Sequence, residues 1–229
     1  MEILFRSAAT VAENLAMDNA AGRLAGATGL RQLRFWWGGP PAVAMGSSER
    51  PEQVVHVEAC AKLGVEVLKR STGGGSVLQT ADVLNYSLVT PAPASLNPKA
   101  GFRPGIDLIC EILAAFGVLG RPEGTSDVTV DNRKISGNAQ ARRWGALLVH
   151  GTLLIDFDYD LAEAVLKHPP REPGYRRARS HRDFLVTLRS LGVHADRAAI
   201  ERAAFEAARQ VFGTRSSSSN REESCHVDR

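Results

Sequence analysis

Length, composition and charge exclude several classes of protein. The 229 residues, 44% of them hydrophobic and 23% charged, fit one globular domain, and a net charge of +3 does not predict nucleic-acid binding. No stretch approaches the roughly 20 apolar residues of a membrane span, and residues 1–6 lack a signal-peptide pattern, so we expect a cytoplasmic protein without a membrane partner. Cys60, Cys110 and Cys225 fit neither a disulfide framework nor a close metal-ligand pair and are expected to be reduced thiols.

The first half of the chain alternates between helical and extended patterns. Helices are predicted over residues 8–24, with Gly26 marking the end, and over residues 51–63. Short apolar runs predict strands at residues 33–37, 42–45, 65–68 and 84–89. The third of these strands leads into a glycine-rich loop at residues 70–78.

The second half begins with a predicted helix over residues 106–116. A hairpin is predicted at residues 128–136, because the Asp131-Asn132 pair tolerates the positive φ of a two-residue turn. A longer strand follows at residues 146–155, and four consecutive serines followed by charges predict a disordered tail at residues 214–229. Helices are predicted between them at residues 161–167, 181–191 and 197–212.

Three consecutive glycines, Gly73 to Gly75, lie close behind Arg70. A backbone without Cβ atoms lets a ligand approach its amide hydrogens, and such a nest favours anions. The Arg70 side chain adds a planar cationic fork that can hold a phosphate or a carboxylate. The segment is neither a Walker loop nor a dinucleotide fingerprint, and a tight turn beside a surface charge is the alternative interpretation.

Two further segments carry side chains that suit catalysis. Lys134 lies on a predicted hairpin strand, which holds a lysine more precisely than a loop does, although a lone strand lysine is most often only solvated. His150 precedes Gly151 within an apolar strand, where a histidine is usually a hydrogen-bonded core residue. Taken singly, these segments leave the structural and the functional interpretation open.

Taken in order, the segments resemble the catalytic domain of lipoate-protein ligases. The resemblance covers residues 1–190 and rests on Asn14–Asp18, Leu33–Trp36, Arg70–Val77, Leu84–Ser87, Arg133–Gln140 and His150–Leu154. It implies an α/β (α+β) fold with a central mixed β-sheet flanked by helices, which biotin-protein ligases and octanoyltransferases share. The catalytic domain is expected to span residues 1–213.

The resemblance also implies an activity, which is the ATP-dependent attachment of lipoate or octanoate to a lysine of a lipoyl domain or a glycine-cleavage H-type protein. ATP and lipoate would be the substrates, with Mg²⁺ as the counterion and Asp127 as its candidate ligand. Lys134 would contact the α-phosphate and the acyl carbonyl of an acyl-adenylate, where negative charge grows. The other adenylate-binding residues would be Arg70, Gly73, Gly74, Gly75, Ser76, Val77, Leu78, Gln79, Asn85, Gly137, Asn138, Ala139, His150, Gly151 and Thr152. Val77, Leu78 and Trp36 would line an acyl tunnel or belong to the core.

The chain departs from the family pattern in two places. Gln79-Thr80 stands where the family usually has a His-Asp pair, which weakens the case for a base there. Only short helices and a polar tail follow the catalytic domain, so we expect the small domain of many ligases on a separate accessory subunit, or a different acyl donor.

Alternative functions of the same fold remain open. Ligase-like octanoyltransferases and lipoyl amidotransferases are expected to carry a nucleophilic cysteine in the loop before the lysine hairpin, but that loop reads Gly124-Thr125-Ser126-Asp127. The arginine-rich glycine signature of biotin-protein ligases is missing. A protein that binds lipoyl-adenylate or a lipoyl domain without turnover is a second alternative. The arginine-rich run 171–182 predicts a solvated basic surface or a docking site for an acidic acceptor.

Overall fold

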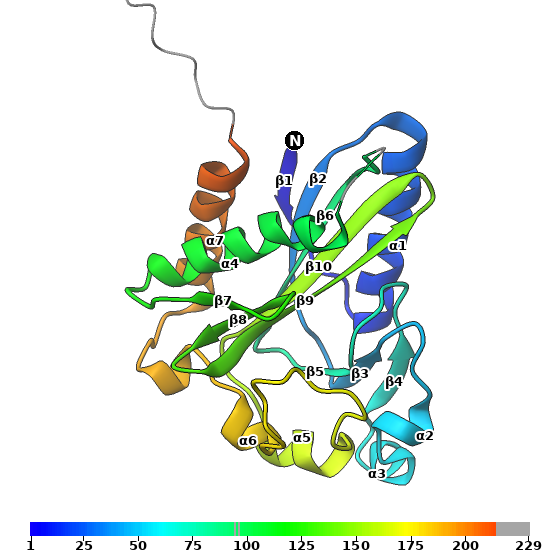
Figure 1. Ribbon diagram of the computed structural model, residues 1–229, viewed down its shortest axis with the longest axis vertical. Helices are drawn as coiled ribbons and strands as arrows, with labels where there is room; N and C mark the ends of the chain where they lie inside the picture. Colours follow the sequence, from blue (N-terminus) through cyan, green and yellow to red (C-terminus); the bar gives the residue numbers. More distant parts are fainter. Residues whose placement is uncertain (94, 96, 214–229) are drawn as a thin grey trace, which may run out of the picture.

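A mixed seven-stranded β-sheet forms the centre of the computed structural model (Figure 1), which describes residues 1–93, 95 and 97–213. Its strand order is β1-β2-β6-β10-β9-β8-β7. The β1 and β2 strands are parallel, and the other neighbouring pairs are antiparallel. A second, three-stranded sheet has the order β4-β3-β5. The glycine-rich loop connects β4 to β5 at one end of this small sheet.

The strands are β1 (Glu2–Phe5), β2 (Gln32–Trp37), β3 (Ala42–Met45), β4 (Glu66–Lys69), β5 (Val77–Gln79), β6 (Val83–Pro91), β7 (Arg121–Glu123), β8 (Asp127–Val130), β9 (Arg133–Arg143) and β10 (Ala146–Leu154). The α-helices are α1 (Val11–Thr28), α2 (Pro51–Val54), α3 (Val57–Lys62), α4 (Arg103–Ala114), α5 (Tyr159–Val165), α6 (His181–Phe184) and α7 (Arg197–Phe212). Two 3-10 helices are η1 (Pro98–Phe102) and η2 (Arg189–Leu191). The described helices include none with both the length and the apolar character of a membrane span.

Alternation along the central strands distributes side chains between two hydrophobic layers. On β10, Leu147 and Val149 belong to the large core that includes buried residues of α4 and α7, whereas Leu148 faces the cluster around Ala25 of α1. Successive strand residues point to opposite faces of a sheet, so α1 covers one face while α4 and α7 cover the other. The structure therefore confirms the expected central mixed sheet flanked by helices.

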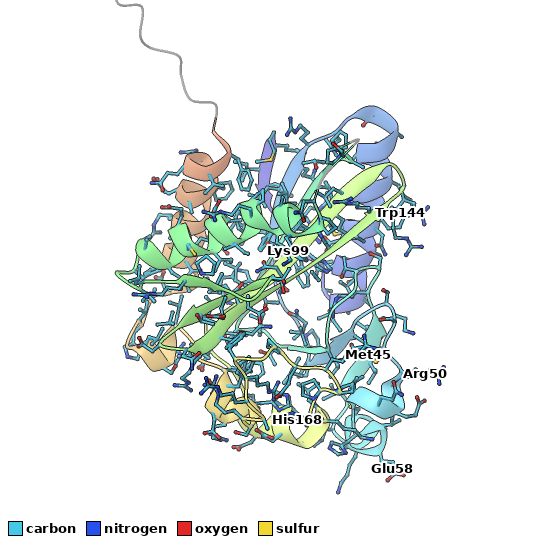
Figure 2. The ribbon with its side chains drawn as sticks, in the orientation of Figure 1. Met45, Arg50, Glu58, Lys99, Trp144 and His168 are labelled. Carbon is cyan, nitrogen blue, oxygen red and sulfur yellow. The ribbon has the colours of Figure 1, made fainter. Side chains whose placement is uncertain are left out.

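Two N-terminal helix predictions need correction. The first helix begins after Thr10, which forms a capping box with Glu13, and it runs through Gly26 to end before Gly29, whose φ is 80°. Gly26 allows α1 to pack closely against the tip of the β9–β10 hairpin, where Trp144 lies (Figure 2). A Cβ at position 26 would lie 1.6 Å from the backbone oxygen of Trp144. The predicted helix at 51–63 is two short helices, since the chain breaks at Val55 to form a β-bridge with Leu166.

The predicted helix at residues 181–191 is wrong. The chain forms the short helix α6, an extended stretch and then η2. Val186, Thr187 and Leu188 are all buried, so burial in this stretch does not follow one helix face. The Val186 amide donates to the carbonyl of Lys134 and the Leu188 amide to the carbonyl of Leu154, both at 2.9 Å. The β1 and β7 strands were not predicted, and the predicted tail at 214–229 lies outside the described residues.

Candidate active site

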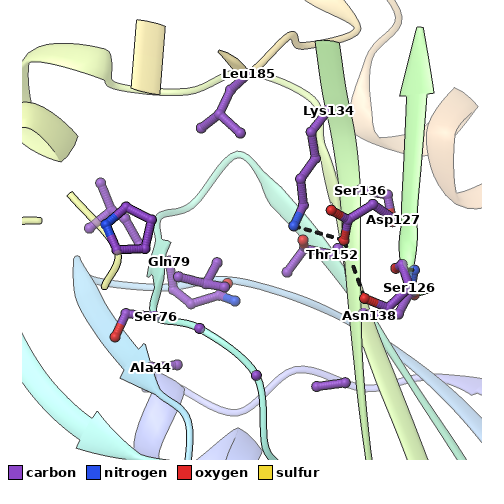
Figure 3. A pocket seen from close by; sticks show the side chains of 18 of the residues that line it. Ala44, Ser76, Gln79, Ser126, Asp127, Lys134, Ser136, Asn138, Thr152 and Leu185 are labelled. Carbon is purple, nitrogen blue, oxygen red and sulfur yellow. Dashed lines mark hydrogen bonds and ion pairs between the residues drawn. The ribbon is translucent and has the colours of Figure 1, made fainter. Parts of the chain in front are cut away.

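A cavity of about 320 Å³ lies where the two sheets and the segment between α5 and α6 meet. Figure 3 shows Lys134 reaching into it from β9, with Gln79 and Ser76 on the opposite side. All of the predicted binding residues except Gly73 line this cavity, and so does Asp127. The fold therefore gathers residues that are more than 80 positions apart in the chain, such as Arg70 and Thr152.

The ammonium of Lys134 has one charged partner and is partly exposed. Its Nζ lies 2.9 Å from Oδ1 of Asp127, and the side chain is 27% exposed. A Cβ on Gly137 would lie 2.7 Å from both Cε and Nζ of this lysine, so the absence of a side chain at Gly137 leaves the space that the amine occupies. A register shift between Val128 and Thr129 of β8 places Ile135 as the extra residue on β9. The lysine thus sits beside a β-bulge, a feature that re-aims side chains.

Asp127 is buried and has three partners. Its Oδ1 pairs with Lys134 and accepts a hydrogen bond of 3.4 Å from the hydroxyl of Ser126, and its Oδ2 accepts a hydrogen bond of 2.8 Å from the hydroxyl of Tyr175. Among the described residues there is no group of three or more His, Cys, Asp or Glu side chains arranged to hold a metal ion. The geometry makes Asp127 the counterion of Lys134.

Arg70 holds the glycine-rich loop together. Its guanidinium is buried and donates four hydrogen bonds, to Thr72 Oγ1 (3.0 Å) and to the carbonyls of Ala44 (2.6 Å), Gly73 (2.7 Å) and Gly75 (2.8 Å). Burial lowers its pKa to about 10, although the charge of Glu49 acts in the opposite direction. With four of five N–H donors bound to the protein, this side chain has one left for a ligand, which differs from the open fork expected from the sequence.

A buried chain of polar groups connects the loop to α1. Thr72 Oγ1 lies 2.7 Å from Nε2 of His150, and Nδ1 of the same ring lies 3.2 Å from Asp18, which also pairs with Arg34 at 2.5 Å. Burial alone would raise the pKa of Asp18, but the hydrogen bond from His150 and the charge of Arg34 outweigh it, so this pKa lies below its usual value. The Asp18 carboxylate therefore requires a proton on Nδ1 of His150, which fixes the ring orientation behind the loop.

Amide side chains and a tyrosine complete the polar part of the cavity. Gln79 and Asn85 exchange two hydrogen bonds, at 2.9 and 3.0 Å, across the floor of the site. Tyr86 donates to Asn138 on β9, whose amide donates to the carbonyl of Ser126 at 2.7 Å. Gly151 has to be glycine, because a Cβ there would lie 2.1 Å from Oδ1 of Asn138. Several predicted binding residues thus have structural partners as well as cavity surface.

The apolar lining includes Trp36, Val77 and Leu78, for which the sequence left an acyl tunnel and the core as alternatives. Trp36 and Leu78 belong to buried hydrophobic clusters and line the cavity at the same time, while the role of an acyl tunnel stays a prediction. Leu15 of α1 and Leu154 of β10 add to this apolar surface.

The sequence did not predict one wall of the cavity. It comes from the segment between α5 and α6 and its continuation, including Lys167, Arg176 and Leu185. Arg176 is only 5% exposed, so the arginine-rich run is not a uniformly solvated surface. Glu49, which accepts hydrogen bonds from Ser76 (2.9 Å) and the Gly46 amide (2.8 Å), was also missed, because nothing in its loop sequence distinguishes it. Ser136 could have been found from its place in the lysine motif.

Comparison with known proteins identifies the family. A family model for the lipoyl protein ligase A/B catalytic domain matches residues 10–209. The chain belongs to this family, as the resemblance predicted.

Its curated relatives include both kinds of enzyme in the family. It is 33% identical over 192 residues to the octanoyltransferase LipM of Carboxydothermus hydrogenoformans, with 75% of this chain and 71% of that protein covered. It is 28% identical over 137 residues to the lipoate-protein ligase LplJ of Bacillus subtilis, where the match covers 60% of this chain and 41% of the relative. The similarity to these relatives therefore does not distinguish between the octanoyltransferase and the ligase activity for this chain.

Among solved structures, the chain is similar to a bi-partite lipoate protein ligase from Thermoplasma acidophilum, studied with its E2 lipoyl domain. The TM-score is 0.80 at 27% identity, with 92% of this chain and 82% of that chain covered. A lipoate-protein ligase A bound with ATP has the same TM-score of 0.80 at 24% identity, over 92% of this chain and 84% of the other, and supports the fold alone.

Proposed function

We propose that the chain joins lipoate or octanoate to ATP and transfers the acyl group from the adenylate to a lysine of a lipoyl-domain or H-type acceptor protein. The catalytic domain would be residues 1–213, acting in the cytoplasm on ATP with Mg²⁺. One observation carries the proposal. A partly exposed ammonium, that of Lys134, faces a cavity whose other side is a glycine-rich loop followed by apolar residues.

The charges of the cavity suit an acyl-phosphate anhydride. Adenylation and acyl transfer both build negative charge on the phosphate and the carbonyl oxygen. A fixed ammonium that reaches both oxygens stabilises these transition states more than the ground states. Lys134 can exchange its contact with Asp127 for the phosphate without losing a charged partner, and the triphosphate oxygens would carry the Mg²⁺.

The ligase activity is favoured over the transferase activity by the side chains available. A thioester route needs a thiol near the acyl carbonyl, whereas the loop before β8 reads Gly124-Thr125-Ser126-Asp127. Of the two cysteines that the structure describes, Cys60 is buried in the cluster under α3 and Cys110 lies on α4. Burial raises the pKa of both thiols, and neither lines the cavity. Cys225 lies outside the described residues.

An accessory subunit and a lipoyl-domain acceptor are part of the proposal. The bi-partite ligase of Thermoplasma acidophilum, studied with its E2 lipoyl domain, is the similar structure that supports both partners. A relative from the same organism is named lipoate-protein ligase A subunit 1, and it is 29% identical over 157 residues. In such an arrangement, adenylation would need the second polypeptide while transfer from a ready-made adenylate would not.

The test uses the full chain and one lipoyl domain with three acyl donors. The donors are ATP with Mg²⁺ and free lipoate or octanoate, synthetic octanoyl-adenylate, and octanoyl carrier protein without ATP. Mass spectrometry of the lipoyl domain records the acylated lysine. We expect acylation from the adenylate, and from ATP with free acid either directly or once a small subunit is supplied.

The second candidate is an octanoyltransferase, which the 33% identity to LipM favours. Acylation from octanoyl carrier protein, with none from the adenylate or from ATP, would overturn the ligase proposal and establish this one. Binding of the adenylate or the lipoyl domain without acylation from any donor would instead identify a non-catalytic binding protein.

A further inference from the structure

Tyr175 connects the wall between α5 and α6 to the predicted catalytic lysine. Its hydroxyl donates to Oδ2 of Asp127 at 2.8 Å, while Lys134 Nζ lies 2.9 Å from Oδ1 of the same carboxylate. The three side chains come from separate segments, namely β8, β9 and the arginine-rich run. Both oxygens of Asp127 are therefore occupied: Oδ1 by the amine and, at 3.4 Å, by the Ser126 hydroxyl, and Oδ2 by the phenol.

The structure fixes Tyr175 from several directions. Its ring packs against Phe184 with centroids 5.2 Å apart, and its carbonyl accepts a hydrogen bond of 2.8 Å from Arg179. Arg179 also donates to the carbonyl of Asn132 at the β8–β9 turn, at 3.0 Å. The chain that contains Tyr175 and Val186 therefore contacts both strands of the hairpin. The Val186 amide donates to the carbonyl of Lys134 on β9, and the Tyr175 hydroxyl donates to Asp127 on β8.

The phenol of Tyr175 is a permanent donor. Burial first, and the Asp127 carboxylate second, raise its pKa well above the usual value. The hydroxyl therefore stays protonated at neutral pH and donates to Asp127, which has no proton to offer in return. A carboxylate held at both oxygens cannot rotate freely, and so the ammonium on its other oxygen stays in one place.

We propose that Tyr175 is a positioning residue for the acyl-transfer site, which acts on Lys134 by orienting Asp127. The inference rests on the proposed function of Lys134. Tyr175 is not among the described residues that line the cavity, so its removal should affect the reacting geometry more than substrate binding. It also explains why a tyrosine lies within a run of arginines at this wall.

The first test compares Tyr175→Phe with Tyr159→Phe. Each substitution removes one hydroxyl and keeps the ring, and the Tyr159 hydroxyl donates a long hydrogen bond, of 3.5 Å, to the Leu185 carbonyl. We expect Tyr175→Phe to lower kcat for acylation from octanoyl-adenylate about tenfold, with KM within about twofold, as loss of one hydrogen bond to a charged group predicts. Tyr159→Phe should match the wild type. A kcat of Tyr175→Phe within twofold of wild type, or an equal loss in Tyr159→Phe, overturns the proposal.

The second test does not depend on turnover. Brief reductive methylation followed by peptide mass spectrometry gives the labelling rate of each lysine, with exposed Lys99 as the internal reference. We expect Lys134 to be labelled about fivefold faster in Tyr175→Phe than in the wild type or in Tyr159→Phe, because the Asp127 contact is weaker. Equal rates at Lys134 would sink this inference even in an active enzyme. If the wild type acylates nothing, the proposed function fails while this comparison still decides the role of Tyr175.

Discussion

The glycine-loop wall and the hairpin wall of the cavity each carry a basic side chain, and the two side chains differ in exposure and in the number of their partners. On the glycine-loop wall, Arg70 is 6% exposed and donates four hydrogen bonds within the protein. On the hairpin wall, Lys134 is 27% exposed and has one carboxylate partner. A cation with most of its donors bound to protein oxygens shapes a site, whereas one with a single exchangeable partner can pair with a charged ligand instead. Replacing either residue should separate these roles.

The largest effect is expected from Lys134→Ala. Loss of the ammonium removes the charge that stabilises the growing oxyanion, and we expect kcat for acylation of the lipoyl domain to fall about 100- to 1000-fold. The melting temperature should fall modestly, because the buried Asp127 loses its cation but keeps its hydrogen bonds from Tyr175 and Ser126. Lys62→Ala, on the exposed side of α3, is the matched control and should retain full activity. A Lys134→Ala enzyme within about tenfold of wild type would contradict the assignment.

Gly137→Ala should displace the amine without unfolding the strand. The new Cβ would come within 2.7 Å of Cε and Nζ of Lys134, and the flexible end of that lysine can move away. A misplacement of about 1 Å can cost roughly 100-fold in rate, so we expect a loss of that order in kcat with a nearly unchanged melting temperature. Gly174→Ala, where a Cβ meets open space, is the control. Equal activity of the two variants would show that the position of the amine is unimportant.

Arg70→Lys tests the structural wall. A lysine keeps the charge but cannot reproduce a planar fork that reaches three carbonyls and a hydroxyl. We expect a loss of about 2 kcal/mol in the free energy of unfolding, which is roughly 4 to 8 °C in melting temperature, and about a tenfold loss of activity from a looser loop. Arg121→Lys on the exposed edge strand should show neither change. Lost activity with an unaltered melting temperature would make Arg70 a ligand-binding residue instead.

The smallest effect concerns acid. The pKa of Asp18 lies below its usual value in the folded protein, so its charge contributes stability above about pH 4, and this contribution disappears as the pH falls through the folded pKa. The free energy of unfolding of the wild type should therefore fall more steeply with acid than that of Asp18→Asn, by up to about 1.4 kcal/mol per pH unit. Denaturant titrations between about pH 5 and about pH 3 measure the slopes. Parallel slopes would mean that Asp18 is not the titrating group.

The hairpin wall was predictable because its signals are local. Asp131 and Asn132 adopt φ values of 48° and 60°, as the predicted two-residue turn requires. Lys134 follows two positions after Asn132, on strand β9. His150 lies in a strand whose apolar residues fill two layers. Residues that share one hairpin come together whatever the rest of the fold does.

The wall formed by the segment between α5 and α6 and its continuation was not predictable, because contacts with residues distant in sequence determine its conformation. Leu185, Leu188 and Leu191 recur at a helical spacing, which led to the wrong helix at 181–191. The backbone instead extends to bond with Lys134 and Leu154, and neither partner is near in sequence. The four bonds of Arg70 are equally invisible, since two of the acceptors are carbonyls within a loop whose shape the arginine itself maintains. Sequence patterns therefore predict contacts between residues near in sequence better than contacts between distant ones.

The paired amides of Gln79 and Asn85 have a consequence for how the reaction responds to acidity. A His-Asp pair at the first position would bring an ionisable ring to the floor of the site, whereas two carboxamides keep the same charge across the whole range in which the protein is folded. Protonation therefore cannot repel or recruit a substrate from that surface. Any bend in a plot of rate against pH has to originate elsewhere, in the acceptor amine or in the ionisable side chains that line the cavity.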